Sequence, residues 1–139
     1  DTVQAAVLNV KLDAFINHEL NDVNEVYNKY TKELKGVVKT PVIPKGYLSS
    51  FAQYTIQLES EKERNELKEY LAKNGVPSLI YYTKTMHNQT AFKDLDNKDA
   101  DYPVSTKLCK TVLSLPMHPY LTEDDIHKVS SLIKKFLKK

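Results

Sequence analysis

Apolar residues recur at helical spacing through the N-terminal quarter of the chain and predict one long helix over residues 2–35. At about 1.5 Å per residue, such a helix would span roughly 50 Å. Its first half is apolar on almost all sides, through Val3, Ala6, Val7, Leu8, Val10, Leu12, Ala14 and Phe15. Its second half has only a narrow stripe, made of Leu20, Val23, Tyr27, Tyr30 and Leu34. A helix that is apolar all round needs partners on every side, so we expect residues 3–15 to pack outside this chain's own core.

Three stretches favour β-strands. Residues 37–43 follow the helix stop at Gly36, and Pro41 within them indicates an edge position. Residues 52–58 alternate apolar and polar side chains, which is typical of a half-buried strand. Residues 76–82 are apolar and rich in residues that favour strands.

Capping signals mark the remaining helices. Ser60 and Glu63 predict the start of a helix that carries Leu67, Tyr70 and Leu71. Residues 83–101 are polar and irregular. Pro103 then opens another helix, whose expected core stripe is Val104, Leu108, Val112 and Leu115. Thr122 and Asp125 form a capping box for a last helix that runs to about residue 138. The predicted fold class is α+β: a long N-terminal helix and a small three-stranded mixed sheet covered by helices.

Composition narrows the function classes. The 139 residues carry a net charge of +2, and Arg64 is the only arginine, so a nucleic-acid partner is not expected. No apolar run approaches the roughly 18 residues of a membrane span. The single Cys109 excludes an internal disulfide, suits a cytoplasmic location, and is expected to be a buried structural residue. The chain begins with Asp1 rather than Met, which fits a fragment of a longer protein.

No metal site is expected, because the four histidines lie far apart and none has a second ligand three or four residues on. The more promising candidates leave the end of the third predicted strand. Tyr81, Tyr82 and His87 could hydrogen-bond a polar ligand or stack on a ring there. The alternative reading is that both tyrosines only pack against the core.

Residues 113–137 read LSLPMHPYLTEDDIHKVSSLIKKFL, with a rigid proline-containing loop followed by the capped helix. This run resembles the C-terminal signature of the DegT/DnrJ/StrS family. Its members are pyridoxal-phosphate (PLP) aminotransferases that act on nucleotide-linked ketosugars. Two further segments agree: DTVQAAVL at residues 1–8 resembles the start of the family's interdomain helix. FAQYT at residues 51–55 resembles a strand of members that act on UDP-linked N-acetylated sugars.

The resemblance also bears on the tyrosine loop. In the family this segment reads His-Tyr-Pro-x-Pro-Leu-His followed by Gln, and it reaches the sugar-nucleotide pocket, often that of the partner subunit. Tyr82, His87 and Gln89 match this pattern, and Tyr81 stands in place of the first His. Thr83 and Thr85 replace the two prolines. The resemblance therefore implies substrate-binding roles for Tyr81, Tyr82 and His87.

The family's fold implies that this chain is the C-terminal part of a larger enzyme, with residues 1–35 as interdomain helix and residues 37–139 as a small α+β domain. The Schiff-base lysine of the family lies upstream of the segment that matches Asp1, so no catalytic or cofactor-binding residue is expected here and the fragment alone should be inactive. The full enzyme would be a cytoplasmic homodimer that uses PLP, with glutamate as the amino donor, in surface glycan synthesis.

Two alternatives stay open. Some family members are PLP-dependent sugar dehydratases, in which His replaces the lysine, and that diagnostic position lies outside the chain. The other alternative is a stand-alone binding module without catalysis. An upstream reading frame of some 200 residues would favour the enzyme, and one that starts near Asp1 would favour the module.

Overall fold

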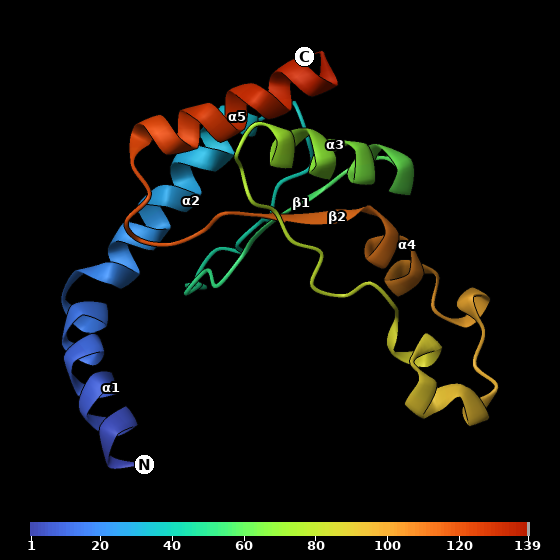
Figure 1. Cartoon of the computed structure of the whole chain (residues 1–139), viewed down its shortest axis with the longest axis horizontal. Helices are drawn as coiled ribbons and strands as arrows, with labels where there is room; N and C mark the ends of the chain where they lie inside the picture. Colours follow the sequence, from blue (N-terminus) through green and yellow to red (C-terminus); the bar gives the residue numbers. More distant parts are fainter. Residues whose placement is uncertain (139) are drawn as a thin grey trace.

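A computed structural model describes residues 1–138 of the chain. The molecule has the shape of an arch: helix α1 descends on one side, the segment of residues 83–102 descends on the other, and the core joins them (Figure 1). We call this second side the 83–102 segment.

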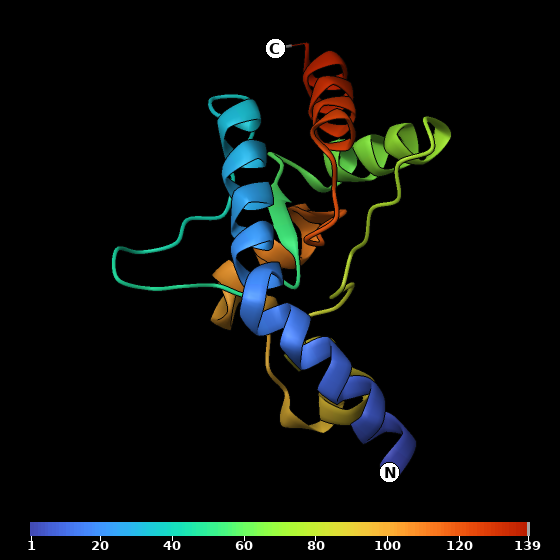
Figure 2. The ribbon, with the colours of Figure 1, turned by 90° about the vertical axis from the view of Figure 1, so that its left-hand side faces the viewer.

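The predicted long helix is present, and it contains one irregular turn. Helix α1 spans Thr2–Ala14, a π-helical turn η1 spans Phe15–Glu19, and α2 spans Leu20–Leu34. The Asp1 carboxylate caps α1, accepting from the backbone N–H of Val3 at 2.9 Å. The rod changes direction near the π-helical turn (Figures 1 and 2). The turn ends where the narrow apolar stripe of α2 begins to pack on the core. Helix α2 is therefore partly buried, whereas α1 has no buried residue.

The sheet differs from the prediction. It consists of two antiparallel strands, β1 at Tyr54–Gln57 and β2 at Val112–Leu115, in the register Tyr54 to Leu115. The three-stranded sheet is therefore not confirmed. Of the three predicted strands only 52–58 forms one, while the other two stretches each contribute a single bridging residue, Lys39 to Gln57 and Leu79 to Ser114. Prolines within or beside both stretches lack the N–H that a longer ladder would require.

Strand β2 was predicted as the end of a helix, and that prediction was wrong. Helix α4 spans Pro103–Thr111 and stops there. The carbonyl of Thr111 accepts instead from the backbone N–H of Leu58, next to β1, at 2.9 Å. The spacing of Val112 and Leu115 suits a helix, but the short, mainly apolar run Val112–Leu115 suits a buried strand as well, and pairing with β1 decides between them.

The capped helices agree with their sequence signals. Helix α3 spans Glu61–Lys73 with Ser60 as its cap, and α5 spans Glu123–Leu137 with the Thr122–Asp125 capping box formed. The 83–102 segment contains three short 3₁₀ turns and no strand: η2 at Met86–Asn88, η3 at Thr90–Leu95 and η4 at Asp99–Asp101.

One core is shared by α2, α3, α5 and the two strands. Its fully buried large side chains are Tyr30, Leu34, Tyr54, Ile56, Leu67, Leu71, Leu113, Ile126 and Ile133. Helix α1 contributes no buried residue. Among the residues that the structure describes, no helix is long and apolar enough to cross a membrane.

Arg64 connects α3 to the junction between α4 and β2 through side-chain hydrogen bonds. The residue is only 5% exposed. One guanidinium nitrogen donates to the carbonyl oxygens of Cys109 at 3.2 Å and Val112 at 3.4 Å. These carbonyls lie at the end of α4, where a helix no longer satisfies its own acceptors.

We predict that Arg64→Leu lowers the free energy of unfolding by about 1–3 kcal/mol, because it leaves both carbonyls without this donor. Urea unfolding followed by circular dichroism measures the change. Lys62→Leu is the matched control on the same helix, since that side chain is 84% exposed. Equal effects of the two substitutions would show that the Arg64 bonds do not stabilise the fold.

Candidate functional site

A cavity of about 550 Å³ lies between the 83–102 segment and α4. Its wall is mainly apolar and aromatic, with residues from η2, η3 and α4: Tyr82, Lys84, Thr85, Met86, His87, Phe92, Leu95, Asn97, Tyr102, Ser105, Leu108, Cys109 and Val112. An apolar cavity with a few polar groups at its wall is the usual form of a small-molecule site.

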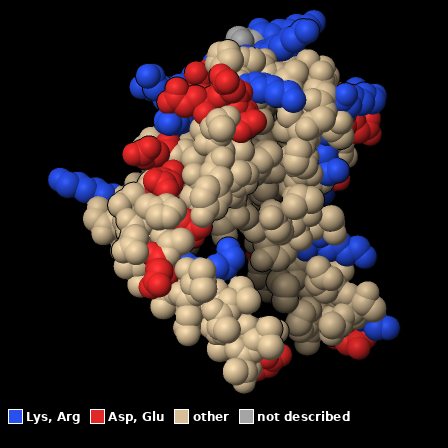
Figure 3. All heavy atoms as spheres, turned by 60° about the vertical axis from the view of Figure 1, so that its left-hand side comes forward, with Lys and Arg blue, Asp and Glu red and all other residues tan. Residues whose placement is uncertain are grey.

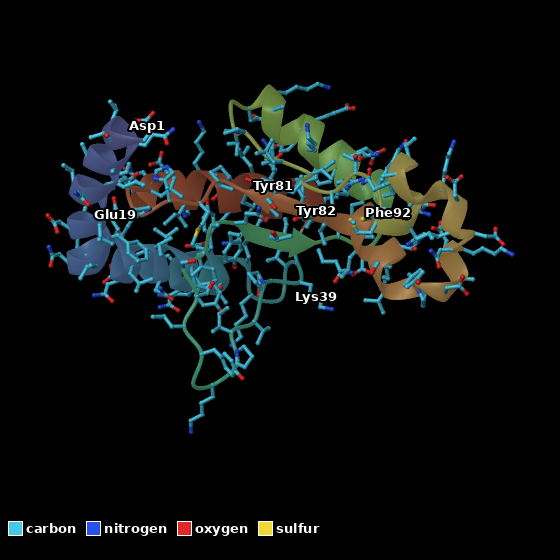
Figure 4. All side chains as sticks on the ribbon, turned by 90° about the horizontal axis from the view of Figure 1, so that it is seen from below. Asp1, Glu19, Lys39, Tyr81, Tyr82 and Phe92 are labelled. Atoms are coloured by element: carbon cyan, nitrogen blue, oxygen red, sulfur yellow. The ribbon has the colours of Figure 1, made fainter. Side chains whose placement is uncertain are left out.

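Two of the three residues predicted from the sequence lie in this wall. Tyr82 lines the cavity, and the residue is 71% exposed, so its ring and hydroxyl are open to a ligand. His87 lines it from η2. Tyr81 lies outside the lining and is 51% exposed. Figure 4 shows Tyr81, Tyr82 and Phe92 together on the underside of the arch.

His87 is held on several sides. Its side chain is only 6% exposed. Nε2 lies 2.8 Å from Oδ1 of Asp99 and 3.1 Å from Oγ1 of Thr85. The imidazole also stacks on the ring of Tyr102, with 4.8 Å between ring centroids and 24° between ring planes. Tyr102 in turn donates its hydroxyl to the side-chain oxygen of Asn97.

Asp99 joins this cluster from the far end of the 83–102 segment. Its Oδ1 accepts from the side-chain amide of Asn88 at 2.7 Å as well as from His87. The same Asn88 amide donates to Oγ1 of Thr85 at 2.9 Å. These hydrogen bonds, that of His87 first, lower the pKa of the Asp99 carboxyl. The carboxylate is therefore ionised at neutral pH, and Nε2 of His87 is the donor in their bond.

Sequence reasoning missed Asp99, Tyr102 and Phe92. Asp101, Tyr102 and Pro103 were interpreted only as a helix start, and Pro103 does occupy the first turn of α4. That position makes Tyr102 the residue before the helix and brings its ring against His87. Phe92, which lines the cavity, and Asp99, which binds His87, lie in a polar stretch with no periodic pattern, so no sequence signal pointed to either of them.

Cys109 was expected to be a buried structural residue. It is partly buried and lines the cavity from α4. Two other histidines have polar partners on helices: His18 lies 2.8 Å from Asp22, and His127 in α5 lies near Ser131 on the same helix and near Glu33 in α2. Within residues 1–138 no group of three or more His, Cys, Asp or Glu side chains could hold a metal ion.

The loop at residues 116–122 contacts the π-helical turn of the long helix. The Tyr120 hydroxyl donates to the carboxylate of Glu19, and this bond raises the pKa of Tyr120. A smaller cavity of about 200 Å³ lies at this contact, lined among others by Glu19, Phe51 and His118. Phe51 has a positive φ of 41°, which is unusual for a bulky side chain.

The lining of the 550 Å³ cavity offers no enclosed lysine to which PLP could attach. Such a cofactor needs a lysine for covalent attachment and donors for its phosphate. The large cavity has one lysine in its lining, Lys84, and that residue is exposed rather than enclosed. Its lining contains no arginine, since the only one, Arg64, lies outside the lining and binds the backbone carbonyls of Cys109 and Val112.

Comparison with known proteins defines the class. The family model of the DegT/DnrJ/EryC1/StrS aminotransferase family matches residues 1–134. The chain therefore belongs to this family. The resemblance inferred from residues 113–137 and from the N-terminal residues is confirmed.

Two curated relatives illustrate the likeness. A UDP-2-acetamido-2-deoxy-3-oxo-D-glucuronate aminotransferase of Pseudomonas aeruginosa is 37% identical over 87% of this chain and 32% of its own length. A UDP-N-acetyl-3-dehydro-α-D-glucosamine 3-aminotransferase of Acidithiobacillus ferrooxidans is 36% identical over 78% of this chain and 28% of its own length.

Solved structures share the fold. A DegT DnrJ EryC1 StrS aminotransferase from Brucella abortus matches with a TM-score of 0.88 and 43% identity, over 100% of this chain and 36% of that chain. The PLP form of a Streptococcus pneumoniae protein matches with a TM-score of 0.82 and 24% identity, over 93% of this chain and 33% of that chain. This chain thus spans about a third of the length of the proteins that it matches.

We predict that the chain on its own binds no PLP at a defined lysine, because the described residues provide no enclosed amine. The purified chain is mixed with PLP, reduced with borohydride, digested, and analysed by mass spectrometry. Scattered trace labelling is the expected result. A stoichiometric pyridoxyl group on one lysine of this chain would contradict the prediction. The full-length protein is the positive control, and it should be labelled at one lysine outside this chain.

Proposed function

We propose that this chain is the C-terminal part of a PLP-dependent aminotransferase that moves an amino group to a ketosugar carried on a nucleotide. The match of the family model to residues 1–134 is the observation that supports this proposal most strongly. The two curated relatives described above favour a UDP-linked N-acetylated 3-oxo sugar as the substrate. We further propose glutamate as the amino donor and surface glycan synthesis as the pathway.

The assembly and location follow from the same proposal. The full enzyme is proposed to be a homodimer in the cytoplasm, and the single cysteine of this chain suits a reducing compartment. Residues 1–35 are proposed as the interdomain helix and residues 37–139 as the small domain. The fragment by itself is proposed to be inactive, because the anchoring lysine lies outside it.

Tyr81, Tyr82 and His87 are the proposed substrate-binding residues. Tyr82 is the most accessible of the three and lies in the cavity wall. His87 uses Nε2 to bind Asp99, which leaves Nδ1 as the nitrogen that can accept from a sugar hydroxyl or an N–H. Tyr81 is proposed on position alone, since it lies outside the lining of this cavity.

In the proposed reaction these residues bind and orient the sugar. When PLP is bound by the rest of the protein, it supplies the electron sink for amino transfer. A tyrosine hydroxyl and a neutral imidazole can form hydrogen bonds to the substrate without taking part in proton transfer. Their contribution is therefore positional, and losing one should affect substrate binding more than the chemical step.

Two other functions remain possible outcomes of a test. A sugar dehydratase of the same family would carry His where an aminotransferase carries the anchoring lysine. A binding module would have no catalytic domain upstream. The complete reading frame distinguishes all three, and it should be read first.

The decisive assay uses the full-length protein with PLP, a UDP-linked N-acetylated 3-oxo sugar and glutamate. Mass spectrometry should detect the UDP-amino sugar together with 2-oxoglutarate. Loss of water from the sugar with no amino product would favour the dehydratase. A reading frame that starts near Asp1, together with no turnover, would favour the binding module.

For Tyr82→Phe and His87→Ala in the full-length enzyme, we expect kcat/KM to fall by roughly ten- to a hundred-fold, mainly through KM. That loss corresponds to about 1.4–2.7 kcal/mol of binding energy. Steady-state kinetics measures it, and the visible absorbance of the bound cofactor should not change. Tyr47→Phe is the matched control, because this exposed tyrosine lies outside the cavity lining. Unchanged kinetics would make Tyr82 and His87 packing residues, and loss of PLP would place them in the cofactor site.

We also propose that residues 3–15 pack against the rest of the protein or, in the isolated chain, against a second copy. Val3, Val7, Leu8, Val10, Leu12, Phe15 and Ile16 are all exposed. In Figure 3 the lower end of the molecule, where α1 lies, has few charged side chains. Burying this surface would remove a large apolar patch from water.

We predict that the 16.0 kDa chain sediments as a dimer or larger species, and that Val7→Glu with Leu8→Glu shifts it towards the monomer. Analytical ultracentrifugation measures both. The paired substitution Asn9→Glu with Gln4→Glu adds the same charge at polar positions of α1 and serves as the control. In the full-length protein, Val7→Glu with Leu8→Glu should lower the free energy of unfolding. A monomeric chain together with an unaffected full-length protein would contradict the proposal.

A further inference from the structure

The 83–102 segment has almost no regular backbone pairing to hold its shape. Its three 3₁₀ turns contain no buried residue. Its backbone hydrogen bonds are local and lie within single turns, such as Asn88 to Thr85 at 3.1 Å and Tyr102 to Asp99 at 3.2 Å. Bonds of this kind form single turns, but they do not fix one turn relative to another. Side chains must therefore determine how the first turn lies against the last.

Asp99 makes the side-chain connections that cross the segment. Its Oδ1 binds His87 at a separation of 12 residues and Asn88 at a separation of 11. Its backbone carbonyl also lies 3.5 Å from the hydroxyl of Thr106 in α4. One carboxylate thus connects η2, which carries His87, to η4 and to the helix that forms the opposite wall of the cavity.

The ring of Tyr102 adds a second contact at the same point. It stacks on the His87 imidazole whose Nε2 is bound to Asp99. A planar ring that is stacked on one face and hydrogen-bonded at one edge has little freedom to rotate. A charge-assisted hydrogen bond to an ionised carboxylate is also stronger than a neutral one. The bond from His87 to Asp99 is therefore the strongest single constraint on the orientation of this ring.

We propose that Asp99 is a positioning residue of the substrate site: by binding Nε2 of His87 and the amide of Asn88, it holds η2 against η4 and keeps the wall that carries Tyr82 and His87 in its binding geometry. This inference rests on the proposed function, because it deepens the role of the same cavity. Asp99 itself lies outside the cavity lining and acts through His87. It makes no contact with the substrate in this proposal.

The first experiment measures the position of the segment and does not depend on the reaction. Hydrogen–deuterium exchange of the full-length protein is followed for peptides that cover residues 83–102. The amide nitrogen of Gln can replace Nε2 of His as a donor to Asp99, whereas Asn is too short to reach it. We expect faster exchange in Asp99→Ala and in His87→Asn, and near-normal exchange in His87→Gln. Asp94→Ala is the control, since Asp94 lies in the neighbouring turn η3 and is exposed.

The second experiment measures the consequence for binding. In the full-length enzyme, Asp99→Ala should raise KM about ten-fold while kcat stays within about three-fold. The double variant Asp99→Ala with His87→Ala should raise KM by less than the product of the two single effects, because Asp99 acts in part through the His87 imidazole. Asp94→Ala should leave both constants unchanged.

The two experiments separate this inference from the proposed function. Unchanged exchange in Asp99→Ala overturns the positioning role, whatever the enzyme does. Faster exchange in a protein that transfers no amino group keeps the positioning role and rejects the proposed function. Equal exchange in His87→Gln and His87→Asn would show that the bond from Asp99 to His87 does not hold η2 against η4. Additive effects of Asp99→Ala and His87→Ala on KM would show that Asp99 does not act through His87.

Discussion

Two backbone hydrogen bonds between Leu79 and Ser114 join the two ends of the stretch, residues 80–113, that forms the candidate site. The N–H of Leu79 donates to the carbonyl of Ser114 at 3.0 Å, and the reverse bond is 2.9 Å long. Ser114 belongs to β2, which is in turn paired with β1. The chain therefore leaves the sheet at residue 79 and returns to it at residue 112 at neighbouring points. Everything between them, including Tyr82, the 83–102 segment and α4, projects from the core as one unit (Figure 1).

This anchoring explains how a segment with little regular structure can present a defined surface. Its two ends are fixed by the sheet, and Arg64 further ties the end of α4 to α3. Between these ends, the contacts among Thr85, His87, Asn88, Asp99 and Tyr102 replace the ladder that a strand would have supplied. Sites are often built on loops held in this way, because a loop can vary in sequence without disturbing the core that carries it.

The long helix shows the opposite arrangement. Helix α2 is amphipathic and buries Val23, Val26, Tyr30 and Leu34 in the core, whereas α1 buries nothing. The bond from Tyr120 to Glu19 joins the loop before α5 to the π-helical turn between them. The direction in which α1 leaves the core is thus determined at this turn, while its apolar surface stays exposed. The proposal that this surface packs against another part of the protein fits a chain that spans about a third of its relatives' length.

Local patterns in the sequence determined the helices, their caps and the family. The Thr122–Asp125 box, the Ser60 cap and the narrow stripe of α2 each depend on residues within a few positions of one another, so spacing alone reveals them. Tertiary structure decided the rest. The stretch 112–115 became a strand because Thr111 and Val112 meet β1, more than 50 residues earlier in the chain. The predicted strands at 37–43 and 76–82 shortened to single bridges. Tyr82 and His87 were candidates from their place after a predicted strand and from the family resemblance. Asp99 and Tyr102 had no such signal, because their contacts with His87 arise only in the folded 83–102 segment.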